Sequence, residues 1–200
     1  MRTLGKIWLA GLALGAAWPA LGQSLSPEQI HEAVDSRQAN AIALYREFLA
    51  LPNDAVHPAD IERLVAWMER TFTARDFETR RIETEGSPSL FAQRLVPGAE
   101  RTVLVYLQAD GQPVDPTAWE QPDPYTAVLK ERDDLGQWQP LPWDALDEQI
   151  DPDWRIFARS AADSKGPMTQ FLVAMEILDS LGFTPGYNLK VIIDTEEELG

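Results

Sequence analysis

Apolar residues recur at helical spacing in two stretches of the first half of the sequence. The segment Ser26-Pro27-Glu28-Gln29 offers an N-cap, a proline at the first helical position and a capping-box glutamine. The apolar positions after it lie mainly on one helix face: Ile30, Val34, Ala41, Tyr45 and Phe48. We expect this helix to end at Leu51-Pro52-Asn53-Asp54 and a second helix to run from about Pro58 to Arg75.

Short apolar runs with strand character follow these helices. We expect strands at residues 77–83, 90–96 and 102–107, and the third run lacks alternation, as in a strand covered on both faces. Residues 112–153 are rich in proline, so regular structure there should be brief. A strand at 154–158, a helix at 166–181 and a strand at 189–193 complete the pattern. This order of elements indicates an α/β layered domain.

The composition excludes several kinds of binding partner and of catalytic site. The 200 residues carry a formal net charge of −15, which argues against nucleic acid or an anionic membrane surface as a partner. Cysteine is absent, so disulfides, thiolate metal sites and a cysteine nucleophile are excluded. Histidine occurs only as His31 and His57, both of which we expect at the surface. The chemistry therefore falls to oxygen and nitrogen groups.

The first residues have the pattern of a secretory signal peptide. Arg2 and Lys6 precede an apolar stretch at residues 7–21, and Ala20-Leu21-Gly22 has the small residues of a cleavage site. A membrane anchor is the alternative, but the stretch is short for a span that needs about 20 residues. We therefore expect residues 1–22 to be removed and the mature protein to be periplasmic or secreted, without membrane attachment.

Acidic residues follow three of the predicted strands. Asp110 follows the strand at 102–107, Asp163 follows the strand at 154–158, and the segment DTEEE at 194–198 follows the last strand. Ligands of open α/β sheets bind beyond the carboxyl ends of the strands. Clustered carboxylates repel one another, and protonation or a bound cation relieves the repulsion. Spacing alone leaves two interpretations open, a divalent metal site or the solvated turns of an acidic protein.

Three segments in order, "LQADGQPVDPTAW", "ARSAADSKGP" and "DTEEELG", resemble motifs of the M20 metallopeptidases, the carnosinase and carboxypeptidase G2-like family. That family has a strand ending in H-x-D, a turn reading roughly G-R-G-x-x-D-x-K-G, and a strand ending in E-E-x-G-S. The upstream helices also fit, so the resemblance covers about residues 40–200. It implies a zinc-peptidase type of α/β domain, with helix–sheet–helix layers and a mostly parallel sheet.

The resemblance assigns a role to each matching acid. Asp163 matches an aspartate that bridges two divalent metal ions, usually Zn²⁺, with Mn²⁺ or Co²⁺ as alternatives. Glu198 matches a ligand of one ion, and Glu197 matches the general base that takes a proton from metal-bound water. Asp110 matches the acid that orients the family's metal-binding histidine. The activity implied is metal-dependent hydrolysis of an amide bond in dipeptides or N-acyl amino acids.

Gln108 stands where the family has that histidine. An amide oxygen is a poorer ligand for zinc than imidazole, which predicts weaker metal binding there or a harder ion such as Mn²⁺. Asp110 would then accept a hydrogen bond from the Gln108 amide. The alternative function is a catalytically impaired relative that binds peptides or amino acids.

Other parts of the family pattern are expected beyond Gly200. These are a later acidic ligand, a later histidine and an inserted lid through which a homodimer would form. We therefore expect residues 23–200 to be the N-terminal part of a truncated catalytic domain, inactive by itself.

Overall fold

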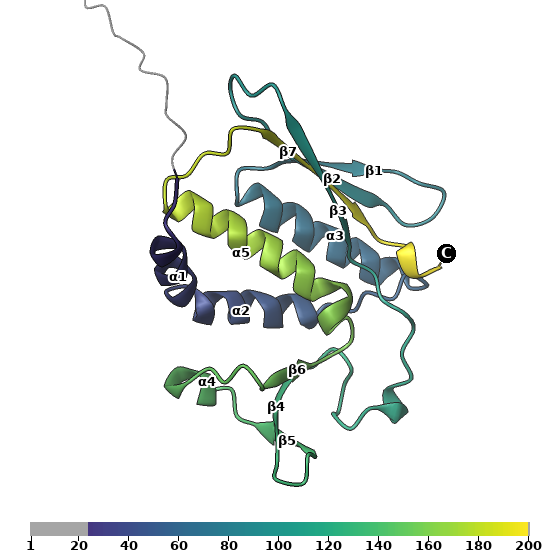
Figure 1. Cartoon of the computed structure of the whole chain (residues 1–200). Coiled ribbons are helices and arrows are strands. Elements are labelled where there is room, and N and C mark those ends of the chain that lie inside the picture. Colours follow the sequence, from purple (N-terminus) through teal and green to yellow (C-terminus); the bar gives the residue numbers. More distant parts are fainter. Residues whose placement is uncertain (1–23, 200) are drawn as a thin grey trace, which may run out of the picture.

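The computed structural model describes residues 24–199, so the predicted signal peptide at 1–22 lies outside the described residues (Figure 1). Among residues 24–199, every helix is too short or too polar to span a membrane. The α-helices are α1 (Pro27–Asp35), α2 (Gln38–Leu49), α3 (Pro58–Thr73), α4 (Ala145–Glu148) and α5 (Gly166–Ser180). The strands are β1 (Glu78–Ile82), β2 (Ser89–Arg94), β3 (Thr102–Gln108), β4 (Val128–Arg132), β5 (Trp138–Leu141), β6 (Arg155–Phe157) and β7 (Asn188–Asp194).

The first predicted helix is two helices. The capping box at its start is confirmed, because the Gln29 N–H donates to Ser26 Oγ at 3.3 Å and the Ser26 N–H donates to Gln29 Oε1 at 2.9 Å. The first helix ends at Asp35, where the C-cap residue Ser36 donates from its hydroxyl to the Ala33 carbonyl at 2.9 Å, and α2 begins only after Arg37. The second predicted helix is confirmed as α3, with its whole apolar stripe buried.

The main sheet is mixed, with the strand order β1-β2-β7-β3. Strands β1 and β2 pair antiparallel, β2 and β7 pair antiparallel, and only β3 and β7 pair parallel. The prediction of a mostly parallel sheet is therefore wrong. A short hairpin joins β1 to β2, which enforces an antiparallel pair, whereas a parallel pair needs a long crossover such as the one that contains α5.

Strand β3 lies at the edge of this sheet and is not covered on both faces. Val103 is 42% exposed, Leu104 61% and Tyr106 54%, so the expected burial of this strand is also wrong. Its continuous apolar run is typical of an inner strand. Within the described residues, however, β3 pairs with only one strand, β7.

Helices α3 and α5 cover one face of the main sheet, as Figure 1 shows. Their buried side chains share one core with residues of the central strands, for example Leu64 of α3, Leu172 of α5 and Val191 of β7. The second helical layer of a helix–sheet–helix domain is not seen among residues 24–199. The predicted α/β class is confirmed, and the described part is a mixed sheet with helices on one face.

A second, smaller sheet is built from two short strands of the proline-rich stretch, β4 and β5, and from β6, which confirms the strand predicted at 154–158. It has the order β5-β4-β6, with both pairings antiparallel. The ring centroids of Trp138 and Phe157 lie 5.1 Å apart within this sheet. The Arg46 guanidinium of α2 lies 4.0 Å from the ring centroid of Trp143, which follows β5. Strand β6 belongs here, so the strand before Asp163 is not part of the main sheet.

Candidate functional site

The ends of β3 and β7 lie side by side, which joins the first and third acidic segments. In the parallel register Gln108 is opposite Asp194. The Ala109 N–H then donates to the Asp194 carbonyl at 2.8 Å, which continues the pairing one residue past the strand. The chain from Gln108 to Asp110 therefore leaves the sheet next to the chain from Asp194 to Glu198.

Asp110 is almost fully buried at this strand end, with 1% of its surface exposed. Its Oδ2 accepts a hydrogen bond of 3.0 Å from the backbone N–H of Glu198. Its Oδ1 is buried and has no hydrogen-bond partner among the described residues. Burial raises the pKa of the Asp110 carboxyl above its ordinary value, and the hydrogen bond from Glu198 opposes this shift.

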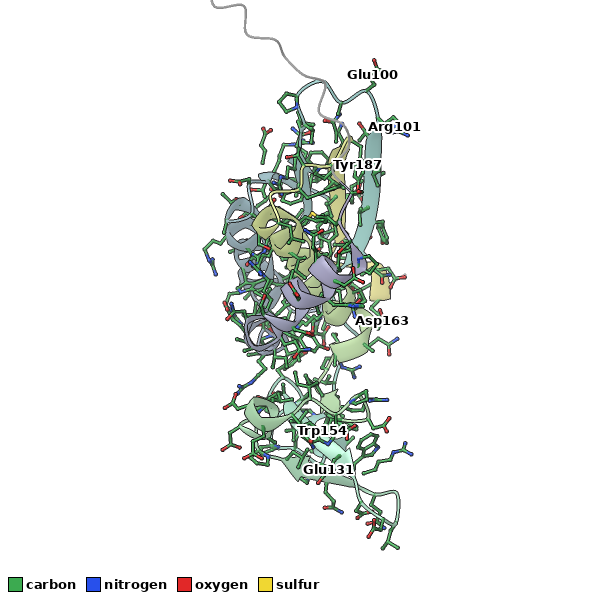
Figure 2. All side chains as sticks on the ribbon, turned by 60° about the vertical axis from the view of Figure 1, so that its left-hand side comes forward. Glu100, Arg101, Glu131, Trp154, Asp163 and Tyr187 are labelled. Atoms are coloured by element: carbon green, nitrogen blue, oxygen red, sulfur yellow. The ribbon has the colours of Figure 1, made fainter. Side chains whose placement is uncertain are left out.

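Ser164 brings the second acidic segment to the same place. Its hydroxyl lies 3.2 Å from the Gln108 carbonyl oxygen and 3.3 Å from Gln108 Oε1. Gln108 thus accepts from Ser164, in place of the expected bond from its amide to Asp110. The neighbouring Asp163 is exposed, and in Figure 2 it lies between the main body and the smaller sheet, on the side of the C-terminal 3-10 helix.

Glu197 and Glu198 lie in a 3-10 turn, Glu197–Leu199, that follows β7. The Glu197 side chain is exposed and that of Glu198 is half-buried. Glu198 Oε2 accepts a hydrogen bond of 3.0 Å from Gln112 Nε2, a contact that sequence reasoning missed although Gln112 lies inside the first motif. The two adjacent glutamates therefore have different surroundings.

The lysine two residues after Asp163 is buried and does not pair with the acidic residues. Lys165 is completely buried, and its ammonium donates to the carbonyl oxygens of Leu49 and Leu51. Burial lowers its pKa to about 7. Among the described residues Lys165 takes part in no ion pair with the acids, so it does not neutralise them.

The donors at this site fit part of a metal site and not a complete one. Asp163 and Glu198 offer carboxylates and Gln108 offers an amide oxygen, a set that suits oxygen-preferring divalent ions. The buried, unpartnered Oδ1 of Asp110 adds a free acceptor beside them. Within residues 24–199, however, no group of three or more His, Cys, Asp or Glu residues comes together to hold a metal ion.

Asn53 is a buried polar residue of this region that sequence reasoning treated only as a helix stop. Its side-chain amide donates to the Ala109 carbonyl at 2.8 Å and to Ser160 Oγ at 3.0 Å. A turn-forming asparagine after a helix gives no signal of such contacts. Only the folded chain shows that this loop touches two of the three site segments.

No protein-family model and no curated protein matches this sequence. The structure does resemble solved peptidases. Human carnosine dipeptidase 1 is 21% identical with a TM-score of 0.68, over 86% of this chain and 35% of that one. The di-peptidase Dug1p of Saccharomyces cerevisiae is 15% identical with a TM-score of 0.67, over 86% of this chain and 35% of that one.

The M20 family metallo-carboxypeptidase Sso-CP2 of Sulfolobus solfataricus is 25% identical with a TM-score of 0.61, over 80% of this chain and 31% of that one. The chain thus spans about a third of the length of the solved peptidases that it matches. The predicted resemblance is confirmed at the level of the fold: this chain shares the fold of the M20 family peptidases.

Proposed function

We propose that this chain forms part of a metal-dependent amide hydrolase that cleaves dipeptides or N-acyl amino acids. The observation that carries the proposal is the convergence of three segments distant in sequence. Ser164, next to Asp163, contacts Gln108, and the Glu198 N–H bonds to Asp110 two residues further along. The likeness to dipeptidases and to an M20 carboxypeptidase supports the same reaction class.

Each residue of this candidate site has a separate role in the proposed hydrolysis. Asp163 and Glu198 would hold divalent ions, with Gln108 as a weaker oxygen ligand, and further ligands would come from outside the described residues. Bound ions would supply Lewis acidity, which acidifies water and polarises the amide carbonyl. Glu197, whose side chain is exposed, would accept the proton of the attacking water and return it to the leaving amine.

Asp110 has a positioning role in this proposal. Its hydrogen bond from the Glu198 backbone fixes the start of the 3-10 turn that carries both glutamates. Glu198 is held at its backbone by Asp110 and at Oε2 by Gln112, and its other carboxylate oxygen, Oε1, would serve as the metal ligand. Glu197 has no hydrogen bond to its side chain among the described residues, which leaves its carboxylate available for proton transfer.

A second candidate is a protein that binds peptides or amino acids without cleaving them. The contact between Gln108 Oε1 and Ser164 favours it, because an amide oxygen already engaged at 3.3 Å is less available to a metal. The substitution Glu197→Gln in the complete gene product separates the two functions. We expect kcat for dipeptide hydrolysis to fall by about 100-fold to 10,000-fold, with Glu148→Gln of α4 as the unaffected control. Wild-type protein that binds dipeptides and does not hydrolyse them would favour the second candidate.

The place of action is also a proposal. The predicted signal peptide supports export to the periplasm or the medium, and the net charge of −15 supports a small peptide substrate over a nucleic acid. A homodimer formed through a lid domain belongs to the same proposal.

A further inference from the structure

We propose that Asn53 is a positioning residue that fixes the end of β3 relative to the turn that carries Asp163. The strand end means residues 108–111 here, and the Asp163 turn means residues 160–165. The structural part of this inference stands on the contacts of Asn53, and its consequence for catalysis rests on the proposed function.

Asn53 contacts both segments at once. It is completely buried, and its side-chain Nδ2 donates to the Ala109 carbonyl at 2.8 Å and to Ser160 Oγ at 3.0 Å. Its backbone carbonyl accepts a hydrogen bond of 2.8 Å from the Gly111 N–H. Both donors of the amide group are therefore used, and each goes to a different site segment.

Ser160 transmits this contact to the Asp163 turn. It is 7% exposed and has a left-handed backbone with φ of 59°. Its carbonyl accepts a hydrogen bond of 3.0 Å from the Lys165 N–H, which closes the turn around Asp163. Holding Ser160 in place therefore holds the loop that presents the Asp163 carboxylate.

The two segments pack so closely that there is no room for an added side-chain atom at Gly111. A Cβ atom on Gly111 would lie 2.2 Å from Ser160 Oγ and 3.1 Å from Asn53 Nδ2. Between residues 108–111 and 160–165, the direct hydrogen bonds are those of the Ser164 hydroxyl to Gln108, at 3.2 and 3.3 Å. Asn53 adds a second, buried connection on the other side of the turn.

Other side chains attach the Asp163 turn to the C-terminal part of α2 and the residues that follow it. Tyr45 donates from its hydroxyl to the Ala161 carbonyl, and Lys165 donates to the carbonyls of Leu49 and Leu51. These contacts bind the turn to residues 45–51 alone. Asn53 differs because it also reaches the end of β3, so it alone of these residues sets the separation of the two segments.

The test is Asn53→Asp in the complete gene product, with Gln121→Glu as a matched control. Asn53→Asp keeps the shape and replaces the donor with an oxygen that faces the Ala109 carbonyl. Gln121 is also a buried amide, 7% exposed, whose Nε2 donates to the carbonyls of Thr126 at 2.8 Å and Phe157 at 3.1 Å, around the smaller sheet. Both variants exchange a buried amide for a carboxylate, and only one lies between the site segments.

Hydrogen exchange is the primary readout, because it does not depend on activity. Relative to the core amide of Val191, we expect the amides of Gly111 and Lys165 to exchange about tenfold faster in Asn53→Asp, a factor that corresponds to one lost buried hydrogen bond. Gln121→Glu should leave both amides unchanged. Unchanged exchange in Asn53→Asp, or equal loosening in the control, would overturn the proposal.

Kinetics then separates positioning from general weakening. We expect Asn53→Asp to lower kcat by about 100-fold with KM nearly unchanged, because a small misplacement of catalytic groups acts mainly on the chemical step. Gln121→Glu should retain kcat. If the wild-type protein hydrolyses no amide, the proposed function fails, and hydrogen exchange still decides the role of Asn53.

Ser160→Ala provides a milder variant in case Asn53→Asp does not fold. It removes the hydroxyl that receives the Asn53 amide and leaves the bond to Ala109 intact. We expect faster exchange at Lys165 and unchanged exchange at Gly111. Unchanged exchange at Lys165 would contradict the proposal.

Discussion

The backbone N–H of Glu198 donates a 3.0 Å hydrogen bond to the buried carboxylate of Asp110. These residues lie at the ends of two neighbouring parallel strands, β7 and β3. The bond therefore attaches the turn with the two glutamates to the strand end that carries Gln108. The other carboxylate oxygen of Asp110 has no partner among the described residues, so the bond to Glu198 is the main compensation for burying this acid.

Two substitutions of Asp110 measure this relationship. Asp110→Asn keeps an oxygen that can accept the Glu198 N–H, whereas Asp110→Ala leaves that N–H without its acceptor. We expect the free energy of unfolding of Asp110→Ala to be about 1 to 3 kcal/mol lower than that of Asp110→Asn. Urea unfolding of the two variants checks this, and equal stabilities would mean that the bond contributes nothing.

Gln108→His should strengthen metal binding. Imidazole nitrogen is a better zinc ligand than an amide oxygen, and the free Oδ1 of Asp110 could accept the second ring N–H. We expect zinc affinity to rise by about tenfold to a hundredfold, measured by competition with a chelating dye. Ser164→Ala is the control, since it frees Gln108 without changing the type of ligand. An unchanged affinity in Gln108→His would contradict a metal site at this position.

Gly111→Ala should destabilise the protein through overpacking. The added methyl group would lie 2.2 Å from Ser160 Oγ, so we expect a loss of about 1 to 3 kcal/mol in the free energy of unfolding. Gly186→Ala is the matched control, because a Cβ there meets nothing within 4 Å. The double variant Gly111→Ala with Ser160→Gly should recover stability, since it removes the colliding hydroxyl. A double variant no more stable than Gly111→Ala would show that the collision is not the cause.

Tyr45 should contribute a stability term that is lost at alkaline pH. Burial raises the pKa of its hydroxyl to about 12 in the folded protein, against about 10 for an exposed tyrosine. Between these values the unfolded state loses the proton that the folded state keeps, so stability falls as pH rises from about 10 to 12. The advantage of wild type over Tyr45→Phe should be present below pH 10 and shrink above it in urea unfolding. A constant difference from about pH 8 to 11 would contradict this.

Local patterns predicted the helices better than the sheet. Ser26 and Gln29 form the expected capping box, and the apolar stripe of α3 is buried. The prediction for strand β3 was wrong because apolar side chains such as Leu104 are typical of a buried strand, whereas β3 lies at the edge of the described sheet. Pairing between β2 and β7 depends on contacts between residues about a hundred positions apart, and a single sequence does not reveal these.

At the candidate site, too, the local motifs were predicted from the sequence and the contacts between distant segments were not. The three acidic segments were predicted from their motifs, and the structure brings their ends together. The contact of Ser164 with Gln108 and the two bonds from Asn53 were not predicted. These contacts join residues 56 to 107 positions apart, so they follow from the fold and not from local sequence.

The proposed function requires that the complete gene product hydrolyses amide bonds with the help of divalent metal ions. The most direct measurement is release of amino acids from a panel of dipeptides and N-acyl amino acids, before and after treatment with a chelator and after return of Zn²⁺, Mn²⁺ or Co²⁺. We expect hydrolysis that the chelator abolishes and that at least one returned ion restores. Absence of hydrolysis with all three ions, or hydrolysis that the chelator leaves unchanged, would contradict metal-dependent amide hydrolysis by this protein.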